Sequence, residues 1–108
     1  MDASRLDVNQ RIEARPVGVV FLPMVTGADI STDGRHLALA TYGPGCMLRV
    51  GENGTWDTTA DSLHIFELPA RRQGESICFD QSGRRLLLTS EFAPTPLYSI
   101  AVPTNDVE

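Results

Sequence analysis

The sequence has few of the features that mark a nucleic-acid-binding protein. Its 108 residues contain nine Lys and Arg against 14 Asp and Glu, so the net charge is −5. Binding to a phosphate backbone requires clustered basic side chains. Only Arg71-Arg72 and Arg84-Arg85 stand as basic pairs, and each is typical of a solvated turn. We therefore expect no nucleic-acid partner.

Long hydrophobic runs are also missing. The longest one, residues 17–25, is interrupted by Pro23 and is far too short to span a bilayer. The first fifteen residues are polar and mixed in charge, without the apolar core of a signal peptide. The expectation from this pattern is a soluble, cytoplasmic protein with no membrane partner.

Soft metal ligands are scarce and poorly spaced. They are Cys46, Cys78, His36 and His64, and no two of them have C-x-x-C or H-x-x-x-H spacing. A structural zinc site is therefore not expected. One disulfide between the cysteines is possible, but two free and partly buried thiols are the more usual outcome. Cys78 lies in an apolar run, which would keep its thiol protonated and inert.

No segment of the sequence matches a nucleophile or cofactor motif. Ser76 lies in Gly-Glu-Ser-Ile-Cys, which is not the Gly-x-Ser-x-Gly elbow. Residues 43–45, Gly-Pro-Gly, suit a hairpin connection better than a phosphate-binding loop. We predict a protein that is not an enzyme and carries no cofactor.

An internal repeat is the strongest positive feature. Residues 28–42 align with residues 77–91 at an offset of 49, so that Gly-Arg matches Gly-Arg and Leu matches Leu twice. Upstream, Phe-Leu-Pro at 21–23 resembles Glu-Leu-Pro at 67–69. Downstream, we align residues 47–50 with residues 97–100. A period in the high forties is typical of blade repeats.

Local chemistry favours strands joined by tight turns. Glycine supplies the positive φ that tight turns need, and Ser or Asp can bond its own backbone, so 31–34 and 80–83 are predicted turns. The apolar runs that follow, 37–40 and 86–88, suit strands covered on both faces. Residues 46–50 and 63–68 alternate, with Leu63 and Ile65 on one face.

Glycine and proline interrupt the chain often, and no window has the apolar stripe of a helix. We read residues 4–14 as a frayed arm or a remnant strand. The expected organisation is a polar arm over 1–15, one domain over 16–103 and a flexible tail over 104–108. The repeat cores within the domain are 25–50 and 74–100.

Residues 31–35, Ser-Thr-Asp-Gly-Arg, between two apolar runs resemble the core of TolB-type and WD40-like β-propeller repeats of bacterial proteins. Residues 80–84, Asp-Gln-Ser-Gly-Arg, form a looser copy. The resemblance implies an all-β fold of two tandem four-stranded antiparallel blades. Closed propellers have about four to eight blades. The chain is therefore expected to be an incomplete propeller or a small β-sandwich.

Three arrangements remain open at this point. The chain is part of a longer propeller, or several copies form a ring, or the two repeats fold on each other as a sandwich. Two blades alone would leave apolar faces uncovered, and such faces call for a partner. We expect a non-enzymatic module that binds a protein partner or associates with itself.

Two alternative functions rest on weaker patterns. In a closed ring, Asp29, Glu75 and Glu91 would lie beside the inner strands and could bind Ca²⁺ or a polar substrate at the axis. Each of these carboxylates is more typical of a strand end or of an arginine partner. Sugar stacking would use the aromatic rings Trp56, Tyr42 and Tyr98, although only 6% of the residues are aromatic.

Overall fold

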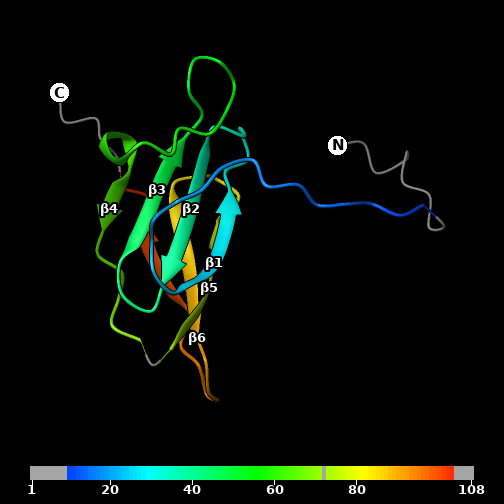
Figure 1. Ribbon diagram of the computed structural model, residues 1–108. Coiled ribbons are helices and arrows are strands. Elements are labelled where there is room, and N and C mark those ends of the chain that lie inside the picture. The colour runs from blue at the N-terminus through cyan, green and yellow to red at the C-terminus, as the bar shows by residue number, and fades with distance from the viewer. Residues whose placement is uncertain (1–9, 72, 104–108) are drawn as a thin grey trace.

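The computed structural model describes residues 10–71 and 73–103, which form two antiparallel β-sheets packed face to face. Figure 1 shows the first sheet in front and the second behind it. Residues 10–22 contain no helix or strand. Most of the predicted arm (residues 1–9) and the whole predicted tail (104–108) lie outside the described residues.

The first sheet has four strands in chain order. Its neighbouring strands are all antiparallel, and a short 3-10 turn at Ala60–Ser62 precedes the last of them. The strands are β1 (Val25–Ile30), β2 (His36–Thr41), β3 (Gly45–Arg49) and β4 (His64–Phe66). This sheet confirms the predicted four-stranded unit.

The second sheet is shorter by one strand. It consists of β5 (Gly74–Phe79), β6 (Arg85–Ser90) and β7 (Tyr98–Ala101), again antiparallel and in chain order. The all-β prediction is confirmed. Instead of the four strands expected for the second repeat, the described residues form three.

The hydrogen-bond register follows the sequence repeat. Ala28 pairs with Leu39 in the first sheet, and Ile77 pairs with Leu88 in the second, each 49 residues further along. Both ladders have a register shift near the start of their first strand. The two sheets are therefore structural copies as well as sequence copies over their first two strands.

The third strands correspond at a different offset. Leu48 pairs with Leu37 and Ile100 pairs with Leu86, which places β7 at an offset of 52 from β3. The sequence alignment of 47–50 with 97–100 was therefore wrong by two residues. The cause is the connection after β6, which is longer than the one after β2.

Both predicted turns are present. Gly34 and Gly83 have φ values of 73° and 74°, a conformation that L-residues with a side chain rarely adopt. The Gly34 amide donates to the Ser31 carbonyl at 2.8 Å, and the Gly83 amide donates to the Asp80 carbonyl at 3.0 Å. Each glycine thus fixes the tight turn between the first two strands of its repeat.

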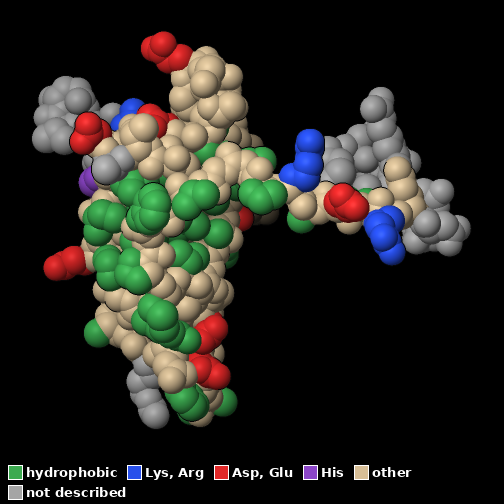
Figure 2. Space-filling view, viewed as in Figure 1, with side chains coloured by type: hydrophobic (Ala, Val, Ile, Leu, Met, Phe, Trp, Pro, Cys, Tyr) green, Lys and Arg blue, Asp and Glu red, His purple; other side chains and the backbone are tan. Residues whose placement is uncertain are grey.

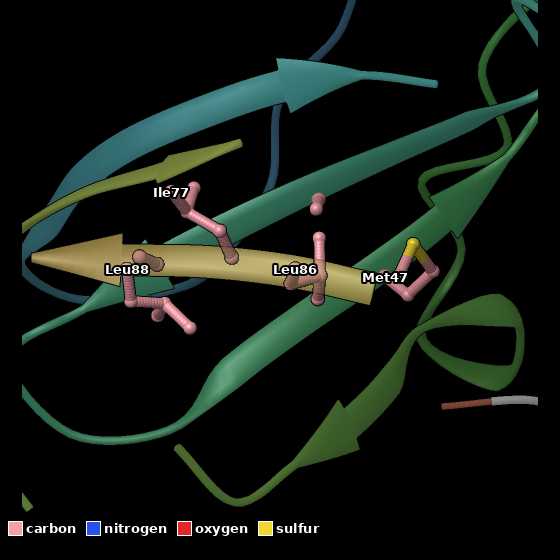
Figure 3. Close-up of a cluster of buried hydrophobic side chains, with 6 residues drawn as sticks. Met47, Ile77, Leu86 and Leu88 are labelled. Atoms are coloured by element: carbon pink, nitrogen blue, oxygen red, sulfur yellow. The ribbon is translucent and has the colours of Figure 1, made fainter. Parts of the chain in front are cut away.

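The main core lies between the sheets. Figure 3 shows Met47 of β3 and Ile77 of β5 gathered with Leu86 and Leu88 along β6. Ala38 and Ala40 of β2 complete this cluster, and all six side chains are buried. A second cluster lies on the other side of the first sheet and contains Leu39, Cys46 and Leu48. Within the described part of the chain, no helix is long and apolar enough to cross a membrane.

Candidate functional site: the open faces and edges of the sheets

The two sheets present opposite faces to each other. In β2, Ala38 and Ala40 point into the core between the sheets, whereas Leu39 points into the second cluster on the far side. The repeat equivalent of Leu39 is Leu88 of β6, and Leu88 points into the core between the sheets. The alanine face of one copy thus packs on the leucine face of the other.

The leucine face of the first sheet is covered by the N-terminal segment, which we define as residues 16–22. Val20 and Leu22 of this segment pack against the second cluster. The alternate side chains point away, so that Val19 is 66% exposed and Phe21 is 94% exposed. Figure 2 shows hydrophobic side chains spread over this side of the molecule.

The N-terminal segment is extended but belongs to no sheet. Its backbone makes no hydrogen bond to another described residue. Water must therefore satisfy its amide and carbonyl groups in a single copy of the chain. The segment has the apolar alternation of a strand, but its backbone pairs with no described strand.

The second sheet exposes a more polar face. On this face the hydroxyls of Ser76 and Thr89 lie 2.5 Å apart, and Arg85 donates from Nε to Ser99 Oγ at 2.6 Å. Leu87 is half-buried among them. The prediction that 86–88 is covered on both faces is therefore confirmed for Leu86 and Leu88 but not for the face that carries Leu87.

The two cysteines differ in environment. Both are free, Cys46 is buried, and Cys78 is exposed on the open face of β5. The expectation of a partly buried Cys78 was wrong, because its face of the second sheet has no cover among the described residues. Burial raises the pKa of the Cys46 thiol, which keeps it protonated.

One edge of the second sheet is also open. β7 pairs with β6 on one side and with no described strand on the other. At the same place in the first sheet, β4 pairs with β3 through Met47 opposite His64 and Cys46 opposite Ile65. Unpaired edges offer backbone donors and acceptors to a further strand.

The inner strands of the two sheets approach each other closely. Asp29 of β1 accepts a 2.7 Å hydrogen bond at Oδ2 from the Phe79 amide of β5. A Cβ at Gly27 would lie 3.0 Å from the Glu75 carbonyl oxygen, so a side chain at this position would push the two strands slightly apart. The carboxylate and the glycine together hold the sheets in their present alignment.

The three carboxylates predicted for the ring axis have different environments in the structure. Asp29 is engaged with the Phe79 amide, Glu75 lies in β5 beside the register shift, and Glu91 directly follows β6. The described residues contain no group of three or more His, Cys, Asp or Glu side chains that could hold a metal ion. Convergence of these carboxylates at the axis of a ring stays a prediction.

Both histidines border one cavity of about 410 Å³. It lies between the two glycine turns, and its lining includes His36, His64, Arg49 and Arg84. His64 is half-buried and stacks on Phe66 with ring centroids 6.1 Å apart. Sequence spacing could not bring these four side chains together because they come from three strands and a turn.

The turn carboxylates are held by hydrogen bonds. Ser31 donates to Asp33 at 2.6 Å, and this bond lowers the pKa of Asp33. Ser82 donates to Asp80 at 2.7 Å and lowers the pKa of Asp80 in the same way. These carboxylates remain charged at neutral pH and stabilise the turns rather than act as proton donors.

A half-buried arginine joins the ends of the sheets. Arg71 donates from Nε to the Pro69 carbonyl at 3.1 Å and from a terminal nitrogen to the Thr41 carbonyl, also at 3.1 Å. Burial lowers the pKa of its guanidinium group. A Cβ at Gly74 would collide with this group, so Gly74 makes room for it.

The three aromatic residues considered for sugar binding have different roles. Trp56 forms an isolated bridge with Val50 that fastens its loop to the end of β3. Tyr98 packs against the core between the sheets, and Tyr42 is exposed in the connection after β2.

Comparison with known proteins identifies no relative of this chain. No family model, curated protein or solved structure matches this chain. The open faces and edges are therefore the features from which a function can be argued. Sequence analysis missed the N-terminal segment as an interaction element, although its Phe-Leu-Pro match to 67–69 was the available signal.

Proposed function

We propose that this chain is a non-enzymatic repeat module that assembles with further sheets of its own kind, as blades do in a propeller. The observation that carries the proposal is the packing of opposite faces, with Ala38 against the side of the second sheet that bears Leu86 and Leu88. Such head-to-tail packing does not close on two units.

Open-ended packing leaves one face of each kind unsatisfied. The first sheet keeps a leucine face that is covered by the N-terminal segment and Leu63 rather than by a second sheet of the described chain, and the second sheet keeps the face that carries Leu87. These two faces are the repeat equivalents of the two faces that already pack on each other inside the chain. Repeat arrays are stabilised by contacts between neighbouring units, so a further unit at either end is favoured.

The partner must tolerate a face with several hydroxyl groups. One hydroxyl of the Ser76–Thr89 pair donates to the other, and Arg85 Nε donates to Ser99 Oγ. Several polar groups of this face are therefore paired within one copy, and the remaining hydroxyl and guanidinium donors need water or an acceptor on the partner when the face is covered. This polarity favours an association that forms and dissociates with concentration.

The Leu87→Glu variant tests this face. Leu87 is half-buried in one copy but would be covered in the assembly, so a carboxylate there should reduce association while unfolding free energy changes by less than about 1 kcal/mol. Sedimentation velocity over a concentration series measures the effect. The matched control is Gln81→Glu in an exposed turn, which adds the same charge. Equal association of both variants with the unmodified protein would contradict the proposed face.

The alternative of a ligand site at the ring axis depends on the same assembly. It would require Asp29, Glu75 and Glu91 of several copies to converge. Calcium titration of the assembled protein and of a Glu75→Gln, Glu91→Gln variant would test it. Identical binding curves would exclude these two side chains.

A further inference from the structure

The N-terminal segment stands in the place of a strand from a missing sheet. Within the chain, Phe66 and Leu68, in and just after β4, pack against the leucine face of the second sheet. Val20 and Leu22 pack in the same way against the leucine face of the first sheet. The N-terminal segment thus packs on the leucine face of the first sheet in the same way as β4 and the residues after it pack on the leucine face of the second sheet.

The sequence aligns the same two stretches. Phe-Leu-Pro at 21–23 matches Glu-Leu-Pro at 67–69, which makes Val20 the equivalent of Phe66 and Leu22 the equivalent of Leu68. Position and sequence therefore agree independently. The N-terminal segment thus corresponds, in position and in sequence, to the fourth strand of a repeat.

A sheet that lacks this strand is present in every copy. Among the described residues, the second sheet has three strands and an unpaired edge at β7. We infer that the N-terminal segment of one copy pairs antiparallel with β7 of a second copy and completes its sheet. This inference rests on the proposed function, since it names the partner and the contact through which the modules assemble.

The repeat fixes the register of the new pair. β3 residues correspond to β7 residues at an offset of 52, and β4 residues correspond to the N-terminal segment at an offset of 46. Met47 opposite His64 therefore becomes Ser99 opposite Gly18. Cys46 opposite Ile65 becomes Tyr98 opposite Val19.

The pairing accounts for the exposed side chains of the segment. Val19 and Phe21 are exposed in one copy because only the alternate residues face the first sheet. In the completed sheet they would lie on the same face as Tyr98 and Ile100 of the second copy, which already pack against its core. Both sides of the segment would then contact apolar side chains.

The inferred pair distributes side-chain volume differently from its counterpart in the first sheet. In the first sheet the ring of Phe66 lies over Gly45, and a Cβ on that glycine would come within 2.7 Å of it. In the inferred pair, Leu97 replaces the glycine and Val20 replaces the phenylalanine. Leu97 is 68% exposed in one copy. The inferred pair therefore has two branched aliphatic side chains opposite each other in place of a ring over a glycine.

Cross-linking between copies tests the register. Two variants, Gly18→Cys and Ser99→Cys, are prepared separately with Cys78→Ser, mixed, and oxidised with glutathione disulfide. Directly opposed residues on antiparallel strands have Cα atoms about 4.5–5.5 Å apart, within reach of a disulfide. We expect a covalent dimer on a non-reducing gel. The matched control replaces Ser99→Cys by Ala101→Cys, which lies about 7 Å further along β7 and should form at least tenfold less dimer.

The outcomes separate this inference from the proposed function. Association without the 18–99 cross-link, or with equal cross-linking at 101, would overturn the strand pairing and leave the proposed function standing. Absence of any association would overturn both. Hydrogen exchange of the unmodified protein gives an independent measurement: amides in 16–22 and β7 should exchange more slowly as concentration rises, and unchanged exchange in an associating protein would overturn the pairing.

Discussion

At the residue scale, a few polar contacts determine how the repeats join. Asp29 is the clearest case, because its carboxylate accepts the Phe79 amide across the gap between the sheets. Sequence analysis predicted only that Asp29 would lie beside an inner strand. It could not show the acceptor role, because the donor is 50 residues away and reaches Asp29 only after the sheets have packed.

Replacing Asp29 should destabilise the fold. In Asp29→Ala the part-buried Phe79 amide loses its acceptor, which should reduce the free energy of unfolding by about 1–3 kcal/mol. Asp29→Asn keeps an acceptor oxygen and should lose less. Urea denaturation of both variants measures the difference. Equal stability of Asp29→Ala and the unmodified protein would mean that this bond does not align the sheets.

The carboxylates of the two turns predict that the stability of the fold decreases in acid. The folded pKa values of Asp33 and Asp80 lie below the ordinary value of 3.8 because Ser31 and Ser82 donate to them. Their contribution to stability is therefore present above pH 3.8 and is lost as the pH falls through the folded pKa values. Carboxyl NMR titration should give midpoints below 3.8 for both. Ser31→Ala and Ser82→Ala should raise the corresponding midpoint, and an unchanged midpoint would exclude the hydrogen bond as its cause.

At the element scale, local chemistry predicted the strands and turns but not the packing of their faces. Glycine turns and apolar runs located β2 and β6 because those signals act within a few residues. The alignment of β7 failed by two residues because loop length varies without disturbing a repeat. The face that each strand buries depends on the neighbouring sheet, so the exposure of Cys78 could not be predicted from its apolar surroundings.

Strand burial predicts the cost of truncating the core. Leu88 is fully buried between the sheets, and Leu39 is buried beneath the N-terminal segment. Leu88→Ala and Leu39→Ala should each reduce the free energy of unfolding by about 2–5 kcal/mol. Chemical denaturation with the half-buried Leu87→Ala as control tests this. A loss below about 1 kcal/mol at Leu39 would show that the N-terminal segment does not cover this face in solution.

At the scale of the whole molecule, the described part of the chain contains two repeats that pack through opposite faces, and its second sheet has three strands where its first has four. These features share one explanation, in which the N-terminal segment completes the second sheet of another copy. Heterologous contacts of this kind form a ring when their rotation closes and a longer array when it does not. The sequence repeat predicted the incompleteness. The geometry of the N-terminal segment added a specific way of completing the fold.

The most direct test of this account is the mass of the unmodified protein in solution. Sedimentation equilibrium over a wide concentration range should give a species whose mass is a multiple of the 11.8 kDa chain and whose fraction increases with concentration. A single 11.8 kDa species at every concentration, with a cooperative thermal transition, would contradict the assembly of these repeats.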